Sequence, residues 1–129
     1  MANRAGDWFM QAEHDLEHAT AAAESKRFDW ACFAAHQAAE KAVKALHLHH
    51  GQEAWGHVVA KLLAELPESV RPSDRLLDAA RVLDTFYIPT RYPDSHSEGP
   101  PFRHYGSYQG EEALRHAGDI LSFVRQAMA

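Results

Sequence analysis

At 129 residues the chain has the size of one domain, long enough to bury a single core but not two. Apolar residues make up 46% and charged residues 24%, as in ordinary globular chains, and no apolar run approaches the roughly 20 residues of a membrane span. The net charge of −5 argues against broad, non-specific nucleic-acid binding, although it leaves room for a local positive site.

The first predicted helix covers about residues 7–24, where apolar residues recur at helical spacing. Ahead of it, MANRAGDW has no hydrophobic segment behind Arg4, so we expect no secretory signal and place the protein in the cytoplasm. A short polar turn at residues 25–27 predicts that this helix and the next are antiparallel neighbours.

The second predicted helix, residues 28–50, is the longest segment without Pro or Gly. Small residues lie four and three apart and form a narrow seam that lets another backbone come close: Ala31, Ala35, Ala38, Ala42 and Ala45. We therefore expect this helix at the centre of a bundle. Asp29 is a candidate cap for its first turn, and Gly51 marks its end. The lone Cys32 cannot form an intrachain disulfide and is expected to be a small buried hydrophobe.

Three further helices complete the prediction, at about residues 57–66, from Ser73 to before Pro89, and at about 109–126. Pro67 ends the first of them, and Ser73 is the expected cap of the second. No strand pattern, repeat or low-complexity tract interrupts the series. The sequence predicts one all-α domain over residues 1–129, an antiparallel up-and-down bundle of four to five helices with a long ordered loop before the last.

That loop, residues 88–107, contains four prolines and two glycines. A connection of this length without regular structure is uncommon in a compact domain and is usually functional or disordered. All four tyrosines lie in or beside it, so we expect aromatic packing to order it. Because it also carries Arg91, His96, Arg103 and His104, it is the predicted place for binding or chemistry.

Three stretches resemble the HEPN domain, a small helical module of prokaryotes and higher eukaryotes: DWFMQAEHDLEHA, WACFAAHQAAEKAVKAL and FYIPTRYPD. The specific combination is Trp30, Cys32, Gln37, Ala38, Ala39, Glu40, Lys41 and Lys44. The resemblance spans residues 7 to about 108 and implies a homodimer. It also implies, as a candidate partner, a separately encoded minimal nucleotidyltransferase, with nucleotide bound in the cleft between them.

Arg91 and His96 have the spacing R-x4-H, and many HEPN proteins resemble metal-independent endoribonucleases through an R-x(4–6)-H motif. A histidine can take the proton of a ribose 2′-hydroxyl or protonate the leaving 5′-oxygen, while an arginine holds the phosphate. Two motifs facing each other across a dimer would supply acid and base together. The product would be a 2′,3′-cyclic phosphate.

The same two residues also have a structural interpretation. Ribonuclease members of the family carry the motif at the start of a helix, whereas Pro93 and Gly99 place it here in a loop. In the toxin branch a modifiable tyrosine lies two residues after the histidine, and here that position is Glu98. Arg91 would then pair with Asp94 or with a backbone carbonyl.

Candidate contacts to a nucleotide or RNA are basic and aromatic: Lys41, Lys44, Arg91, Tyr92, Arg103, His104 and Tyr105. For Lys41 and Lys44 we favour a structural role, as solvated ion pairs with Glu40 and as aliphatic cover. Trp8 and Trp30 fit core or dimer positions, while Trp55 lies in an expected loop.

A histidine cluster raises the question of a metal site: His47, His49, His50 and His57. On a helix His47 and His49 point to opposite sides, so only His47 and His50 could share an ion. Histidines at a helix C-terminus also gain from the helix dipole without any ligand. We therefore predict no metal and no cofactor.

Two functions follow as hypotheses. The first is a homodimeric HEPN interaction and nucleotide-binding module beside a separately encoded nucleotidyltransferase, in a toxin–antitoxin, stress or defence system. The second is a metal-independent, toxin-type endoribonuclease that uses Arg91 and His96. The acidic charge, the loop position of the motif and Glu98 favour the first.

Overall fold

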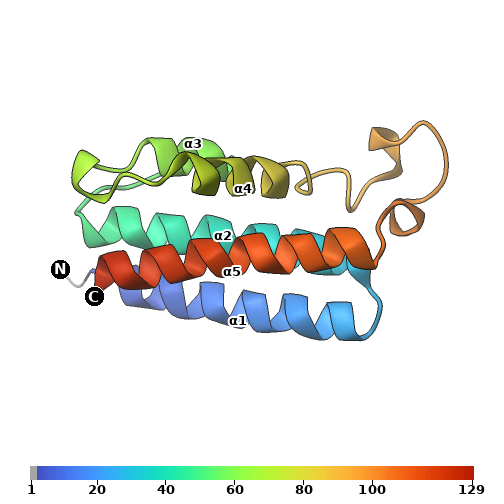
Figure 1. The fold of residues 1–129 in the computed structure, drawn as a ribbon, viewed down its shortest axis with the longest axis horizontal. Coiled ribbons are helices and arrows are strands. Elements are labelled where there is room, and N and C mark those ends of the chain that lie inside the picture. Colours follow the sequence, from blue (N-terminus) through green and yellow to red (C-terminus); the bar gives the residue numbers. More distant parts are fainter. Residues whose placement is uncertain (1–2) are drawn as a thin grey trace.

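The computed structural model describes residues 3–129, which form five α-helices, three short 3-10 helices and no strand. The helices are α1 (Ala5–Glu24), α2 (Phe28–His49), α3 (Val59–Ala64), α4 (Asp74–Asp84) and α5 (Ser107–Met128). The chain runs up and down between two ends, and α1 begins and α5 ends at the end opposite the loop before α5 (Figure 1). The predicted all-α bundle is confirmed. Within the described residues, no helix is long and apolar enough to cross a membrane.

Helix α2 lies between α1 on one side and the α3–α4 layer on the other (Figure 1), and it contacts each of the other four helices. The five alanines of the predicted seam, Ala31, Ala35, Ala38, Ala42 and Ala45, are all 0% exposed. Short side chains here allow neighbouring backbones to pack closely against α2 from several directions. Cys32 is also fully buried, and burial, with a smaller contribution from the charge of Asp29, raises the pKa of its thiol to about 12.

The ends of α2 confirm one prediction and correct another. Gly51 has φ +74°, the Gln52 N–H donates to the His47 carbonyl at 2.9 Å, and the Gly51 N–H donates to the Leu48 carbonyl at 2.9 Å. These two bonds form a Schellman motif, which favours the left-handed glycine. The expected cap at Asp29 is wrong: α2 begins at Phe28 and no side chain caps it.

Helix α3 has an unusual N-terminus, because Val58 precedes it and has no side-chain oxygen to cap it. The cap comes from the last turn of α4. Asp84 accepts the Val59 N–H at 2.7 Å and the Ala60 N–H at 3.0 Å through its two carboxylate oxygens. By contrast, α4 is capped as predicted, since Ser73 Oγ accepts the Leu76 N–H at 3.1 Å.

The loop before α5 is ordered, as expected. It contains 3-10 helices at Pro93–Ser95 and Pro101–His104, and Pro101 is buried. Its start is held by Thr90, whose hydroxyl donates to the Phe86 carbonyl at 2.6 Å, and its end by the Tyr105 ring, 6.0 Å from that of Phe86. The loop therefore presents its side chains in fixed positions.

Gly110 marks where α5 meets the start of α2. A Cβ added there would lie 2.8 Å from Phe28 Cδ1, whereas one added at Gly118, in the same helix, meets nothing within 4 Å. We expect Gly110→Ala to lower the free energy of unfolding by about 1–2 kcal/mol, because overpacking outweighs the gain in helix propensity. Gly118→Ala should raise it by about 0.5–1 kcal/mol through propensity alone. Urea unfolding of both variants checks the opposite signs, and equal signs would contradict the close contact.

Candidate functional site

Arg91 is held in an aromatic pocket rather than by an acidic partner. Its guanidinium donates to the Tyr87 carbonyl through Nε at 2.9 Å and through Nη2 at 2.7 Å. Its Cζ lies 4.2 Å from the ring centre of Phe33 and 5.1 Å from that of Tyr92. Of the two structural interpretations, pairing with a backbone carbonyl is the one observed. Three guanidinium N–H groups remain for other acceptors.

The second residue of the R-x4-H pair, His96, contacts other residues of the loop through both a hydrogen bond and ring stacking. Its Nε2 donates to the Pro89 carbonyl at 2.7 Å, and its ring stacks on His104 with centroids 4.0 Å apart. His104 in turn donates through Nε2 to the Glu98 carbonyl at 2.8 Å. The two histidines thus form a stacked pair that shapes the backbone of residues 89–98.

The remaining predicted loop contacts divide between exposed and packed positions. Arg103 is exposed beside the Phe102 ring, with Cζ 5.8 Å from its centre. Tyr92 is 50% exposed. Tyr105 packs edge-on against Phe86, and burial is the main cause that raises the pKa of its hydroxyl. Tyr105 therefore helps to hold the loop, while Tyr92 and Arg103 face outward.

The Lys44–Glu40 ion pair forms as expected, but it is not solvated, and Lys41 does not take part in it. Glu40 is 5% exposed, and Lys44, whose ammonium lies 3.1 Å from Glu40 Oε2, has a side chain only 12% exposed. Lys41 pairs instead with Asp15 of α1, at 2.5 Å. The i, i+4 spacing of Glu40 and Lys44 suggested a solvent-exposed side of α2. In the structure, the segment leading into α3 covers Glu40.

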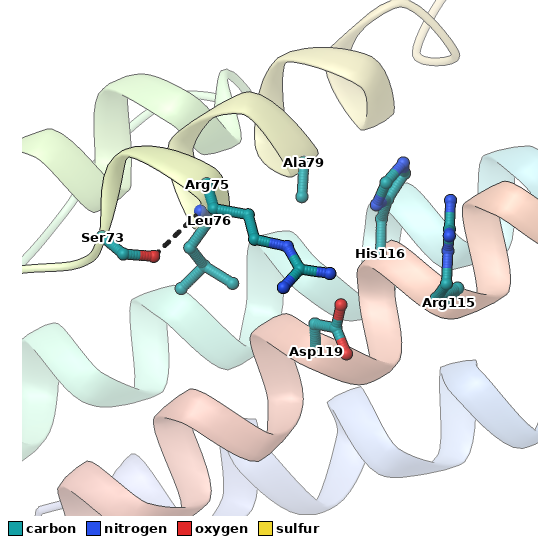
Figure 2. A pocket seen from close by; sticks show the side chains of 7 residues that line it. All are labelled: Ser73, Arg75, Leu76, Ala79, Arg115, His116 and Asp119. Carbon is teal, nitrogen blue, oxygen red and sulfur yellow. Dashed lines mark hydrogen bonds between the residues drawn. The ribbon is translucent and has the colours of Figure 1, made fainter.

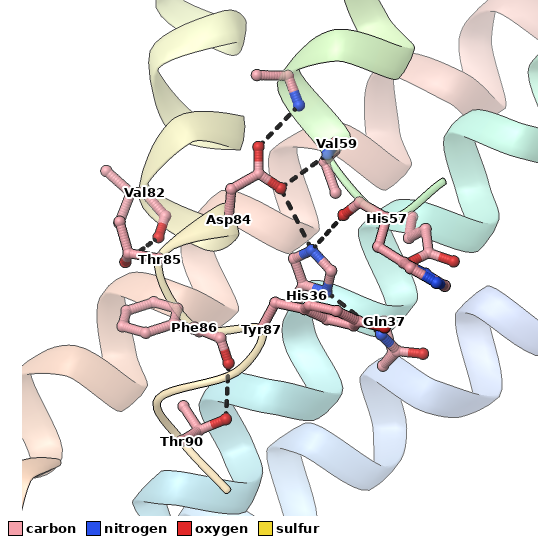
Figure 3. Close-up of polar contacts among 12 residues, drawn as sticks. His36, Gln37, His57, Val59, Val82, Asp84, Thr85, Phe86, Tyr87 and Thr90 are labelled. Carbon is pink, nitrogen blue, oxygen red and sulfur yellow. Dashed lines mark hydrogen bonds and ion pairs between the residues drawn. The ribbon is translucent and has the colours of Figure 1, made fainter. Parts of the chain in front are cut away.

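The group that covers Glu40 is His57, which the sequence suggested only as a metal-site candidate. His57 Nδ1 lies 2.9 Å from Glu40 Oε1, and its ring stacks on Tyr87 with centroids 4.8 Å apart and an 18° interplanar angle. The His57 backbone carbonyl accepts from His36 Nε2 at 2.9 Å, as Figure 3 shows.

His36 is 0% exposed and joins α2 to the cap of α3. Its Nε2 also lies 3.3 Å from Asp84 Oδ1, and Gln37 donates to its Nδ1 at 3.3 Å (Figure 3). Since both partners of Nε2 are acceptors, Nε2 carries the proton. Sequence reasoning missed this network. The one sequence feature that could have indicated the network is Val58 before α3: it cannot cap the helix, so the first N–H groups of α3 need an acceptor from another element.

An exposed apolar surface adjoins Arg91. Trp30 is 50% exposed and packs edge-on against Phe33, with ring centres 6.1 Å apart, and Ile88 beside the loop is 43% exposed. Phe33 and Tyr92 both lie against the Arg91 guanidinium, and we call the patch of Trp30, Phe33 and Tyr92 at the N-terminal end of α2 the aromatic face. Exposed aromatic groups gathered in this way mark interaction sites on soluble proteins.

Several hollows open on the surface, among them one lined by Lys41 with Trp8 and one lined by Trp30 with Arg27; two others bear on the candidate residues. One, of about 410 Å³, opens between α4 and α5 and is lined by Arg75, Arg115, His116 and Asp119, with burial lowering the pKa of His116 (Figure 2). The other, of about 220 Å³, lies by Lys44 between Trp8 and the 80% exposed Trp55. Neither contains a residue of the R-x4-H pair.

The histidine cluster is divided between different surroundings. His47 is 3% exposed and contacts the Leu62 carbonyl and the Gln52 side chain, whereas His49 and His50 are not buried and lie at the end of α2. Among residues 3–129 no group of three or more His, Cys, Asp or Glu side chains is placed to hold a metal ion.

Comparison with known proteins agrees on one family. The family model for the HEPN domain matches residues 5–127. The crystal structure of TT1696 from Thermus thermophilus is 54% identical, with a TM-score of 0.96, covering 98% of this chain and 99% of that one. The archaeal HEPN homologue ST0689 is 38% identical, with a TM-score of 0.85 over 99% and 100% of the two chains. An HEPN domain protein of Thermotoga maritima is 34% identical, with a TM-score of 0.75 over 93% and 95%. A search of curated proteins gives no match.

Proposed function

Because this chain belongs to the HEPN domain family, we propose that it is a homodimeric interaction module that works with a separately encoded minimal nucleotidyltransferase and binds a nucleotide. The role would fall within a toxin–antitoxin, stress or defence system. The proposal depends on surface features of the chain as well as on its family.

The observation that carries the proposal is the aromatic face. Trp30 and Tyr92 are each half exposed, and Arg91 lies between Phe33 and Tyr92 with unused N–H donors. Tryptophan, tyrosine and arginine are the residues that most often dominate binding energy at protein interfaces. A second copy of the chain is the occupant that we propose for this face, because a symmetric dimer would cover both aromatic faces at once.

The nucleotide contacts that fit the geometry best are Arg91 and Tyr92, with Arg103 from the outer part of the loop. A guanidinium fork suits a phosphate, and an exposed tyrosine ring can stack on a base. Lys41 and Lys44 fit less well, since Asp15 and Glu40 already neutralise their charges.

Co-purification tests the partner. The small nucleotidyltransferase encoded beside this chain, if one is present, should co-purify with the tagged native protein. Binding of ATP to the pair, measured by calorimetry, should weaken about tenfold or more in Arg91→Lys, which keeps the charge but loses the planar fork. Absence of an adjoining nucleotidyltransferase, or no complex on co-expression, would contradict the proposal.

The alternative is a metal-independent endoribonuclease that uses Arg91 and His96. Its support is the ordered loop, which fixes both side chains, and the free N–H groups of Arg91. Incubation with RNA in EDTA, using the native chain, Arg91→Ala and His96→Ala, separates the two functions. If RNA cleavage persists in both variants, Arg91 and His96 are not the catalytic residues.

A further inference from the structure

We propose that the hollow between α4 and α5 binds an acidic α-amino acid, such as glutamate, within a single copy of the chain. Arg75 binds its α-carboxylate, Asp119 its ammonium group, and His116 its side-chain carboxylate. Figure 2 shows the three side chains around one hollow, with Arg75 extending from α4 toward Asp119 of α5. The lining includes no residue of the R-x4-H pair or of the aromatic face, so this site is separate from the proposed function.

The hollow has the size and the walls of a small-molecule site. Its volume is about 410 Å³, and such sites usually measure roughly 300–1,000 Å³. Buried Leu76 and Ala79 of α4 give it an apolar wall, and its other lining side chains are polar. Within residues 3–129 no Phe, Tyr or Trp lines it, so a nucleotide base would find no ring on which to stack. The ligand is therefore of a different class from the nucleotide proposed above.

Three ionisable side chains of the hollow, Arg75, His116 and Asp119, take part in no side-chain hydrogen bond or ion pair within residues 3–129. His116 is half-buried, and burial is the largest cause that lowers the pKa of its imidazole. The buried histidines His36 and His47, by contrast, each contact a backbone carbonyl. An imidazole that has lost water without gaining a partner can regain a hydrogen bond from a ligand.

Arg75 and Asp119 carry opposite charges at this hollow, yet they do not form an ion pair with each other within the described residues. The guanidinium has only donors and the carboxylate only acceptors. A ligand that bridges them needs an anionic oxygen for Arg75 and a donor for Asp119. An α-amino acid carries both groups on one carbon, and both contacts would be charge-assisted, which makes them stronger than neutral hydrogen bonds.

His116 and Arg115 supply a third contact beside Asp119. His116 precedes Asp119 by three residues, so the two lie on the same side of α5. Arg115 Nη2 donates to Glu112 at 3.0 Å, which leaves other guanidinium N–H groups for a second acceptor. Because the imidazole N–H is also a donor, the two side chains favour a ligand whose own side chain ends in a carboxylate. Glutamate and aspartate have this group.

Isothermal titration calorimetry of the full chain with L-glutamate and three analogues tests the assignment. Each analogue lacks one group: glutarate the ammonium, 4-aminobutyrate the α-carboxylate, and L-glutamine the side-chain charge. L-Glutamate should bind at least about tenfold more tightly than each analogue, because each one loses a charge-assisted contact.

Substitutions match the analogues group by group. Arg75→Gln should weaken glutamate binding about tenfold and leave 4-aminobutyrate binding unchanged. Asp119→Asn should weaken glutamate binding and leave glutarate binding unchanged, and His116→Ala should reduce the preference for glutamate over glutamine. Arg81→Gln is the control on α4, since Arg81 pairs with Asp78 and does not line the hollow. It should bind glutamate as the native chain does.

Four results would overturn the inference: no heat from the native chain with millimolar glutamate, equal affinities for glutamate and glutarate, undiminished binding by Arg75→Gln, or an equal loss in Arg81→Gln. The same samples are sized by light scattering. Both helices belong to one chain, so glutamate binding should not depend on the dimer. A chain that stays monomeric and binds glutamate would overturn the dimer and leave this site in place.

Discussion

Asp84→Ala should lower the free energy of unfolding by about 2–4 kcal/mol, although it removes a partly exposed side chain outside the alanine seam. The carboxylate accepts the Val59 and Ala60 N–H groups and contacts His36 Nε2. Without it, a six-residue helix has no cap, and two buried or half-buried backbone donors lose their partners. Chemical denaturation followed by circular dichroism measures the effect.

Asp78→Ala is the matched control in the same helix. Asp78 pairs with Arg81 on the surface, where its side chain is 75% exposed, so its loss should cost less than about 0.5 kcal/mol. Asp84→Asn should fall between the two, because the amide keeps one acceptor and turns a donor toward a backbone N–H. Equal effects of Asp84→Ala and Asp78→Ala would show that α3 does not depend on this cap.

Ala38→Leu should be of comparable severity, at about 3 kcal/mol, because the seam has no room for a branched side chain. Ala38 is 0% exposed at the centre of α2, the helix that contacts all the others. The added atoms enter a fully buried position and have no solvent to occupy. Ala21→Leu, on the exposed side of α1, makes the same change with almost no expected effect. A seam that accepts leucine without loss would contradict close helix packing around α2.

Much of the scaffold was predictable because its signals are local. The alanine seam, Ser73 and Gly51 are short-range features, and each one acts as expected. The observed helix ends differ from the predicted ones by a few residues, because the spacing of apolar residues does not indicate fraying or 3-10 turns. The order of the loop before α5 also followed from its aromatic content.

The site was less predictable because it depends on contacts between distant segments. Glu40, His57 and Asp84 come from α2, the loop before α3 and the end of α4. On the sequence, Glu40 and Lys44 form an ordinary surface pair, and nothing local shows that His57 covers them. Gly110 was missed for the same reason, since only Phe28, more than 80 residues earlier, makes it necessary.

Trp30, Phe33 and Glu40 lie along α2, and the Arg91 guanidinium lies against the rings of Phe33, Tyr87 and Tyr92. Ten residues separate Trp30 from Glu40, which is about 15 Å along α2. A dimer that contacts mainly through Trp30 would therefore have its centre about three turns of α2 away from Glu40.

Light scattering of the native chain at successive dilutions, beside Trp30→Glu and Tyr108→Glu, tests the dimer most directly. Both aromatic side chains are exposed, Trp30 by 50% within the aromatic face and Tyr108 by 70% outside it. The native chain and Tyr108→Glu should show twice the 14.5 kDa chain mass, and Trp30→Glu should show 14.5 kDa with unchanged helical content. A native chain that stays at 14.5 kDa at every concentration, or a Trp30→Glu variant that remains dimeric, would contradict the account.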